Sequence, residues 1–414
     1  MSLSTILVNV GLSLLGGYIS SKLIKEYIPI FIARGHFGND QCKVSDKPVP
    51  EPMGMISAAV YLIVIFIFIP FPFLEWTFSG SDFPHDKFLA FMSAIISICT
   101  AILLGFADDM LDLRWRHKLL FPTLSSLPVL MVYYVSGGST TIVVPKVVRY
   151  FVAMYGFQAP TLLEINFLYY IFMGMVIVFC TNAINIYAGV NGLEVGQSLV
   201  ISASIICYNL TQVVRLGDPI DIWHNWLSLY FLLPFFTISY VLWLYNKCPA
   251  MVFVGDTYCY WAGMTIAVSA ILGHFSKTAM LFFIPQAINF VYSVPQLFHL
   301  VPCPRHRLPK YDPRTDTVGM SFAEFKSSDL KSVGSLIINL LAKIGLLYKV
   351  EFEKDGARWT RVNNFTVINL MLKFVGPVHE ATLTNYLLLL QLFFSAVAFT
   401  IRFYLATFIY EVVL

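Results

Sequence analysis

This sequence of 414 residues contains little charge. Asp, Glu, Lys and Arg together make up 12% of the chain, hydrophobic residues make up 57%, and the mean hydropathy is +0.72. Because soluble globular domains carry about 25% charged residues, this composition excludes a soluble globular protein. The formal net charge of +3 is too small for the basic surface of a nucleic-acid-binding protein. Of the classes considered, the composition fits an integral membrane protein.

Cysteine is also scarce, with seven residues in the chain. Four fall inside hydrophobic runs, and the other three fall in loops that the topology below places on one side of the membrane: Cys42, Cys248 and Cys303. Because none lies in a loop on the opposite, oxidising side, we do not expect a disulfide framework. The pair Cys303 and His306 lacks the second ligand pair that a zinc site needs.

Long hydrophobic runs are abundant. About 20 helical residues cross a hydrocarbon core of about 30 Å, and we count about ten runs of this kind. They lie near residues 3–25, 54–74, 88–107, 119–136, 164–187, 195–212, 225–245, 257–274, 278–300 and 385–411. No basic segment precedes the first run, so we predict a signal anchor rather than a cleaved signal peptide. The predicted fold class is an all-α polytopic membrane protein with about ten transmembrane helices.

The basic residues predict the orientation of these helices. About 21 of the 27 Lys and Arg residues fall in loops that follow odd-numbered runs, and about 6 fall in the others. Since basic loops remain in the cytosol, we expect the odd-numbered loops to be cytosolic and both termini to lie on the far side.

One odd-numbered loop, 301–384, is too long to be a simple connection. Apolar and polar residues alternate on both sides of Asp355-Gly356, which predicts a β-hairpin. Segments 335–347 and 365–377 are typical of helices too short to cross a membrane. The chain thus divides into three predicted parts: a transmembrane bundle over 1–300, a small mixed α/β cytosolic subdomain over 301–384, and a final transmembrane helix over 385–414.

Five polar clusters border the hydrophobic runs, and all five fall on the odd-loop side. They are the segment with Lys43, Lys47 and Glu51, the stretch from Asp108 to Lys118, the segment CTNAINIYAGVNGLEVGQ over 180–197, the segment VFVGDTYCY over 252–260, and the segment PCPRHRLP over 302–309. Each has an ordinary explanation taken alone, such as a helix cap, an interhelical hydrogen bond or a cytosolic basic flank. Five clusters on one face together indicate a functional site.

The residue types suggest the chemistry of that face. Oxygen ligands without a His/Cys set suit Mg²⁺, with Mn²⁺ as second choice. Arg and Lys near such a metal suit a pyrophosphate, and glycine loops let the backbone approach a nucleotide closely. Burial in a membrane suggests a lipid as the other substrate. We therefore predict phosphoryl transfer from a nucleotide-linked donor to a lipid acceptor.

The segments GFADDMLDLRWRHK (105–118), CTNAINIYAGVNGLEVGQS (180–198), VFVGDTYCYWAGM (252–264) and VPCPRHRLP (301–309) resemble the polyprenyl-phosphate glycosyl-1-phosphate transferases, glycosyltransferase family 4. The resemblance extends in order over nearly the whole chain, and the last segment and the long insert are similar to those of the eukaryotic branch. It implies Mg²⁺-dependent transfer of GlcNAc-1-phosphate from UDP-GlcNAc to dolichyl phosphate, the first step of N-glycan precursor synthesis. It further implies a multi-pass protein of the endoplasmic reticulum membrane with its active site facing the cytosol. A second copy of the chain and the next-step glycosyltransferase are its expected protein partners.

The resemblance also assigns roles to individual residues. Asn185 and Asp256 correspond to metal ligands, and Asp108, Asp109 and Lys118 to catalytic residues. The remaining assignments are Arg305, His306, Arg307 and Trp115 to the phosphates and sugar, and Gly189, Asn191, Phe253 and Glu51 to the uridine.

A phosphate monoester has a second pKa of about 6, so the acceptor is mostly dianionic at pH 7 and needs alignment and charge neutralisation more than a strong base. We therefore predict direct attack on the β-phosphorus without an aspartyl-phosphate. One of Asp108 and Asp109 would position the acceptor or metal waters, and the other would orient Lys118. Residue chemistry alone leaves three alternatives open: a related transferase with a different sugar nucleotide or polyprenol, a transporter, and a non-catalytic scaffold. Charges at span ends and the lack of a repeat speak against transport.

Overall fold

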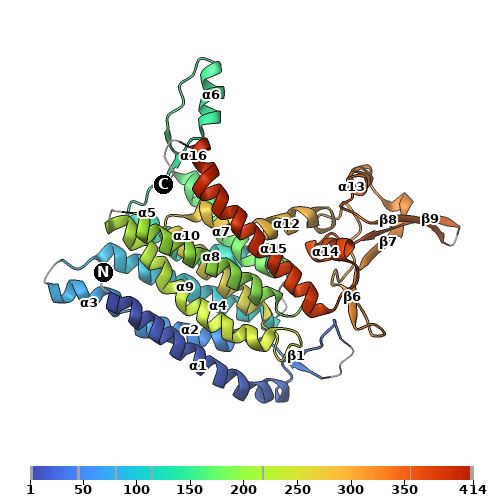
Figure 1. Cartoon of the computed structure of the whole chain (residues 1–414), viewed down its shortest axis with the longest axis horizontal. Coiled ribbons are helices and arrows are strands. Elements are labelled where there is room, and N and C mark those ends of the chain that lie inside the picture. Colours follow the sequence, from blue (N-terminus) through green and yellow to red (C-terminus); the bar gives the residue numbers. More distant parts are fainter. Residues whose placement is uncertain are drawn as a thin grey trace.

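The structure, a computed structural model, describes residues 3–43, 47–79, 82–111, 113, 115–216, 219–354 and 356–410. Most of these residues form a bundle of long helices (Figure 1). Its elements are α1 (Leu3–Ala33), α2 (Gly54–Phe68), α3 (Phe71–Ser79), α4 (His85–Leu111), α5 (Trp115–Val135), α7 (Phe167–Ile186), α8 (Leu193–Arg215), α9 (Pro219–Asn246), α10 (Gly255–Leu272), α11 (Ser276–Leu281), α12 (Ile284–Leu297), α15 (Glu380–Thr400), the π-helical turn η2 (Ile401–Leu405) and α16 (Ala406–Ile409).

Eight helices in the described ranges are long and apolar enough to cross a membrane, which confirms the polytopic helical fold. The two remaining predicted runs differ from such spans. The run near 257–274 forms α10, which has 18 residues and is buried inside the protein rather than exposed to lipid. The run near 278–300 is not one helix, because it is interrupted at Phe282 and Phe283 between α11 and α12. Pro285 is the second residue of α12, in the first turn, where its missing N–H costs no intrahelical hydrogen bond.

Helix α10 lies at the centre of the bundle and packs against α4, α7 and α9. Two glycines allow this close packing. A Cβ at Gly263 would lie 2.4 Å from Cα of Thr181 on α7, and a Cβ at Gly105 on α4 would lie 2.9 Å from Cα of Thr257. Small residues let helix backbones approach each other in membranes. The ends of α4 and α7, which carry predicted site residues, are thereby held against α10.

The insert before α15 is a small α/β unit, as predicted. Its elements are β5 (Lys310–Asp312), β6 (Thr317–Gly319), β7 (Phe322–Lys326), η1 (Ser327–Asp329), α13 (Ser332–Lys343), β8 (Lys349–Lys354), β9 (Ala357–Asn363) and α14 (Val367–Val375). Strands β7, β9 and β8 form an antiparallel sheet in that order. The predicted hairpin is confirmed, with Lys354 opposite Ala357, and Asp355 of its turn lies outside the described residues. Buried Tyr292 of α12 packs in the core of this unit and joins it to the bundle.

Both chain ends lie toward one end of the bundle in Figure 1. The hairpin of β3 (Thr141–Val143), α6 (Lys146–Met154) and β4 (Leu162–Glu164) projects near the C-terminal end. The paired strands β1 (Phe37–Gly38) and β2 (Val49–Pro50) and the insert lie toward the other end, where the predicted polar clusters come together. The final helix begins at Glu380, earlier than the predicted residue 385.

Candidate active site

Lys118 forms the centre of a polar cluster in which four helices meet. Its Nζ donates to Oδ2 of Asp256 at 2.6 Å and forms an ion pair with Oδ2 of Asp108 at 3.1 Å. Nδ2 of Asn185 donates to Oδ1 of Asp256 at 2.6 Å. Asp108 lies in the last turn of α4, Lys118 in the first turn of α5, Asn185 in the last turn of α7 and Asp256 in the first turn of α10. The structure therefore brings these predicted residues into direct contact.

Asp109 holds the beginning of α10. Its carboxylate accepts hydrogen bonds from the backbone N–H groups of Asp256 at 2.6 Å and Thr257 at 2.8 Å, and from the Thr257 hydroxyl. The first N–H groups of a helix lack partners within the helix, and an anion there also interacts favourably with the helix dipole. Gly255 has φ +73°, and a Cβ there would lie 2.7 Å from the Asp109 carboxylate, so the turn and the cap fit only with glycine. Asp109 thus fixes the backbone that carries Asp256.

Asp108 orients Lys118. Its side chain is buried, and its carboxylate also accepts from the backbone N–H of Leu113 at 3.2 Å and the Tyr260 hydroxyl at 3.4 Å. Asn182 on α7 supports the lysine from the other side, because its Nδ2 donates to the Lys118 carbonyl at 3.2 Å. Of the two aspartates, Asp108 is the one that contacts Lys118, whereas the contacts of Asp109 are to the start of α10. The predicted positioning of the acceptor or of metal waters by an aspartate stays a prediction.

Glu51 and Phe253 both lie close to Gly38. A Cβ at Gly38 would lie 2.9 Å from a Glu51 carboxylate oxygen and 3.3 Å from the Phe253 ring. Two backbone hydrogen bonds hold the segments together, from Phe253 to the Pro50 carbonyl and from Met53 to the Phe253 carbonyl, both at 2.9 Å. Burial and the nearby carboxylates of Asp109 and Asp256 raise the pKa of Glu51 to about 7. Glu51 thus adds a further acidic side chain beside Asp109 and Asp256.

Gly189 and Asn191 lie in the loop between α7 and α8. Gly189 has φ +120°, and its N–H donates to the Glu194 carboxylate at 3.3 Å. Asn191 is held by Asp40 and Glu380, as described below. These contacts hold the loop backbone and the buried Asn191 side chain in place.

The segment with Arg305, His306 and Arg307 follows α12 and approaches the α7–α8 loop, because a Cβ at Gly189 would lie 2.3 Å from the Leu308 side chain. Arg305 and His306 are exposed. Within the described ranges no contact joins these three side chains to the Lys118 cluster. Nη1 of Arg307 is buried without a hydrogen-bond partner among the described residues, and burial lowers the pKa of this guanidinium. A guanidinium nitrogen buried without a carboxylate partner among the described residues is suited to binding an anionic group.

Trp115 begins α5, but its side chain lies outside the described part of the structure, so its predicted sugar contact stays a prediction.

An apolar groove of about 590 Å³ runs along α5 and α7. It is lined by Leu119, Leu127, Leu130, Ile171, Gly174 and Val178, with Phe290 of α12 and, at the polar end, Asn182. Since Asn182 also contacts the Lys118 carbonyl, the groove reaches the Lys118 cluster. A long apolar chain in the groove would thus bring a polar head group to the charged residues.

Sequence reasoning missed several residues of this region. Thr257 donates its hydroxyl to Asp109, Tyr260 donates its hydroxyl to Asp108, and Asp40 and Glu380 accept hydrogen bonds from Asn191. Thr257 directly follows a predicted metal ligand, which is a usable signal. Glu380 gives none, because its partner lies 189 residues away in the sequence.

Comparison with known proteins finds relatives that match nearly the whole chain. Residues 91–274 match the family described as Glycosyl transferase family 4. The chain is similar to three curated proteins that bear the name UDP-N-acetylglucosamine--dolichyl-phosphate N-acetylglucosaminephosphotransferase. The protein of Schizosaccharomyces pombe is 43% identical over 98% of this chain and 94% of its own length. That of Saccharomyces cerevisiae is 41% identical over 94% and 89%, and that of Dictyostelium discoideum is 37% identical over 98% and 91%.

Proposed function

This chain belongs to glycosyl transferase family 4, and from that premise we propose that it transfers GlcNAc-1-phosphate from UDP-GlcNAc to dolichyl phosphate. The products are dolichyl-diphosphate-GlcNAc and UMP. The observation that carries the proposal is the Lys118 ammonium between the carboxylates of Asp108 and Asp256, at the polar end of an apolar groove. The groove suits a polyprenyl chain, and the cluster suits two phosphorylated substrates.

The charges of the cluster fit a divalent cation. Asp108, Asp109 and Asp256 bring three carboxylates, whereas Lys118 is the one cation that contacts them among the described residues. Asn185 points its Nδ2 at Asp256, so its Oδ1 remains for another partner. Carboxylate and amide oxygens are the ligands that Mg²⁺ prefers. We propose Asp256 and Asn185 as Mg²⁺ ligands, with Mn²⁺ as a substitute; the bound ion would neutralise the donor pyrophosphate.

The chain's own residues align the two substrates. Asp109 fixes Asp256 through the start of α10, and Asp108 holds Lys118 beside it. When phosphates enter, Lys118 can exchange a carboxylate for a phosphate oxygen, because its side chain is 27% exposed. The acceptor phosphate attacks the β-phosphorus, the bond from that phosphorus to the bridging oxygen breaks, and UMP leaves with that oxygen. Positioning and charge neutralisation supply most of the catalysis in such reactions.

The donor is proposed to lie between the Lys118 cluster and the α7–α8 loop. Glu51, Phe253, Gly189 and Asn191 border the nucleotide in this arrangement, and the orphaned guanidinium of Arg307 meets a phosphate or the sugar. The face that holds the polar clusters is proposed to be cytosolic, as the basic loops suggest. The membrane is proposed to be that of the endoplasmic reticulum, as the resemblance to the eukaryotic branch of the family implies. A homodimer and contact with the next-step glycosyltransferase also belong to this proposal.

The proposal is tested with purified protein in lipid nanodiscs, UDP-[¹⁴C]GlcNAc, dolichyl phosphate and Mg²⁺. We expect label in the lipid fraction from the wild type, a strong loss with Asp256→Ala, and normal transfer with Glu324→Gln, which alters an exposed ion pair on the insert. Replacing UDP-GlcNAc with UDP-GalNAc tests the sugar. No labelled lipid from folded wild-type protein would contradict the proposal.

A further inference from the structure

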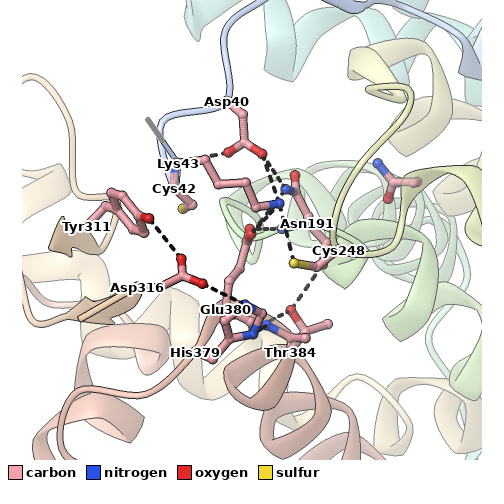
Figure 2. A network of polar contacts seen from close by, with 12 residues as sticks. Asp40, Cys42, Lys43, Asn191, Cys248, Tyr311, Asp316, His379, Glu380 and Thr384 are labelled. Atoms are coloured by element: carbon pink, nitrogen blue, oxygen red, sulfur yellow. Dashed lines mark hydrogen bonds and ion pairs between the residues drawn. The ribbon is translucent and has the colours of Figure 1, made fainter. Parts of the chain in front are cut away.

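A second polar cluster surrounds Asn191 (Figure 2). Its members come from segments far apart in the chain: Asp40, Cys42 and Lys43 after α1, Asn191 between α7 and α8, Cys248 between α9 and α10, and Glu380 at the start of α15. The side chains of Asp40 and Glu380 are only 8% and 3% exposed. Buried carboxylates are tolerated when they are paired and hydrogen-bonded, so their partners indicate their role.

The two carboxylates take both hydrogens of the Asn191 amide. Nδ2 of Asn191 donates to Asp40 Oδ2 at 2.8 Å and to Glu380 Oε2 at 3.2 Å, and its backbone N–H donates to Glu380 Oε1 at 2.8 Å. An amide nitrogen has two hydrogens to give. Oδ1 is therefore the side-chain atom left for a ligand, and no donor in the described part of the chain reaches it. Asn191 is held as a hydrogen-bond acceptor.

Lys43 forms ion pairs with both carboxylates and holds them in place. Its Nζ lies 3.5 Å from Asp40 and 3.4 Å from Glu380, and it donates to the Cys248 sulfur at 3.4 Å. Burial opposes its charge, but Glu380, Cys248 and Asp40 outweigh burial and raise the pKa of Lys43. The backbone N–H of Cys42 donates to the other Asp40 oxygen at 2.9 Å. A cation thus already lies among these acidic groups.

Two neighbours of Glu380 in the chain, His379 and Thr384, help to hold it in position. Thr384, one turn later on α15, donates its hydroxyl to the Asn191 carbonyl at 3.0 Å. His379 caps the helix by accepting from the Ala381 N–H at 3.2 Å, and its ring lies 3.6 Å from the Asp316 carboxylate of the insert (Figure 2). The final helix and the insert therefore hold in place the Glu380 carboxylate, which orients Asn191.

We propose that Asp40, Lys43 and Glu380 are positioning residues that hold Asn191 as an acceptor for the N3–H of uracil, so that the site selects uridine over cytidine nucleotides. This inference rests on the proposed function, in which the donor's uridine borders Asn191. Uracil presents an N–H at position 3, whereas cytosine presents a lone pair there. A freely rotating amide would turn its NH₂ to cytosine, but an amide whose two hydrogens are committed to carboxylates cannot. A site with a fixed acceptor rejects the base that lacks the donor.

The test measures direct binding of UDP and CDP to the full-length protein by calorimetry, together with transfer kinetics. Glu380→Gln replaces one acceptor oxygen with an NH₂ group, and Lys43→Met removes the cation. For both variants we expect the KM for UDP-GlcNAc to rise about tenfold, and the preference for UDP over CDP to fall about tenfold. The kcat and the KM for dolichyl phosphate should stay within about twofold. Lys43→Arg should restore most of the selectivity, and Glu324→Gln is the matched control.

The quantity that tests the proposal is the ratio of UDP to CDP affinity in each variant, compared with that ratio in the wild type. An unchanged ratio of UDP to CDP affinity in folded Glu380→Gln and Lys43→Met would overturn the proposal, as would a loss of kcat with an unchanged KM. If Glu380→Gln does not fold, Asp40→Asn removes one acceptor of the same amide and takes its place. Wild-type protein that binds UDP more tightly than CDP but transfers nothing would contradict the proposed function and not this inference, which the binding data test on their own.

Discussion

Replacing Asp109 with asparagine separates the capping of α10 from the chemistry of the site. The carboxylate accepts from the backbone N–H groups of Asp256 and Thr257 at 2.6 and 2.8 Å. Asparagine keeps one acceptor oxygen and turns an NH₂ group toward the other donor. The loss of one charge-assisted hydrogen bond costs about 1.5–3 kcal/mol, and the weaker interaction with the helix dipole about 0.3–1 kcal/mol. We therefore expect Asp109→Asn to lower the free energy of unfolding by about 2–4 kcal/mol.

Activity should fall with stability, because the same contacts place Asp256. A displacement of about 1 Å at a reacting centre can lower the rate about 10²-fold, and we expect a loss of this size in kcat. The assay combines thermal unfolding in nanodiscs with transfer kinetics. Asp108→Asn is the comparison, since among the described residues Asp108 interacts with side chains of α10 and accepts no hydrogen bond from its backbone N–H groups. Asp108→Asn should lose as much activity and less stability. An Asp109→Asn protein with wild-type stability and no activity would refute the capping role.

Three further predictions concern the substrates and the metal. Gly174→Leu adds a side chain to the apolar groove, so the KM for dolichyl phosphate should rise while the KM for UDP-GlcNAc stays the same; equal effects on both would contradict the groove's assignment. Arg307→Met should raise the KM for UDP-GlcNAc about 10–100-fold, the loss expected for one charged hydrogen bond, and unchanged kinetics would show that its buried Nη1 meets no substrate. Glu51 has a pKa raised to about 7, so falling pH protonates it and removes a negative charge beside Asp256. The Mg²⁺ concentration for half-maximal rate should therefore rise from pH 8 to pH 6, and Glu51→Gln should flatten this dependence; an equally steep dependence in the variant would exclude Glu51 as its source.

Local patterns in the sequence predict much of this molecule. Apolar runs of membrane-spanning length predict the helices, and alternation around Asp355-Gly356 predicts the hairpin of β8 and β9. The break between α11 and α12 is also local, but hydropathy is insensitive to it, because the residues at the break, Phe282 and Phe283, are themselves apolar. The burial of α10 inside the protein depends on the helices around it, so it could not be predicted from the composition of α10 alone.

In the candidate site, too, some features could be predicted from local sequence and others depend on contacts between distant segments. Asp108, Lys118, Asn185 and Asp256 each end or begin a hydrophobic run on the same side, so their approach could be predicted. The division of labour between Asp108 and Asp109 could not, because adjacent residues on a helix point in different directions and meet different neighbours. Glu380 could not be found either, since an acidic residue at the start of a helix is ordinarily a solvated end.

The most direct test of the account follows the β-phosphate. Purified protein is incubated with UDP-GlcNAc labelled with ³²P at the β-phosphorus, dolichyl phosphate and Mg²⁺, and the lipid and aqueous fractions are separated. Transfer of GlcNAc-1-phosphate predicts that the label moves to the lipid with the sugar and that the released nucleotide is unlabelled UMP. Release of labelled UDP, with the sugar alone on the lipid, would contradict the central claim, and so would labelled protein after incubation with the donor alone.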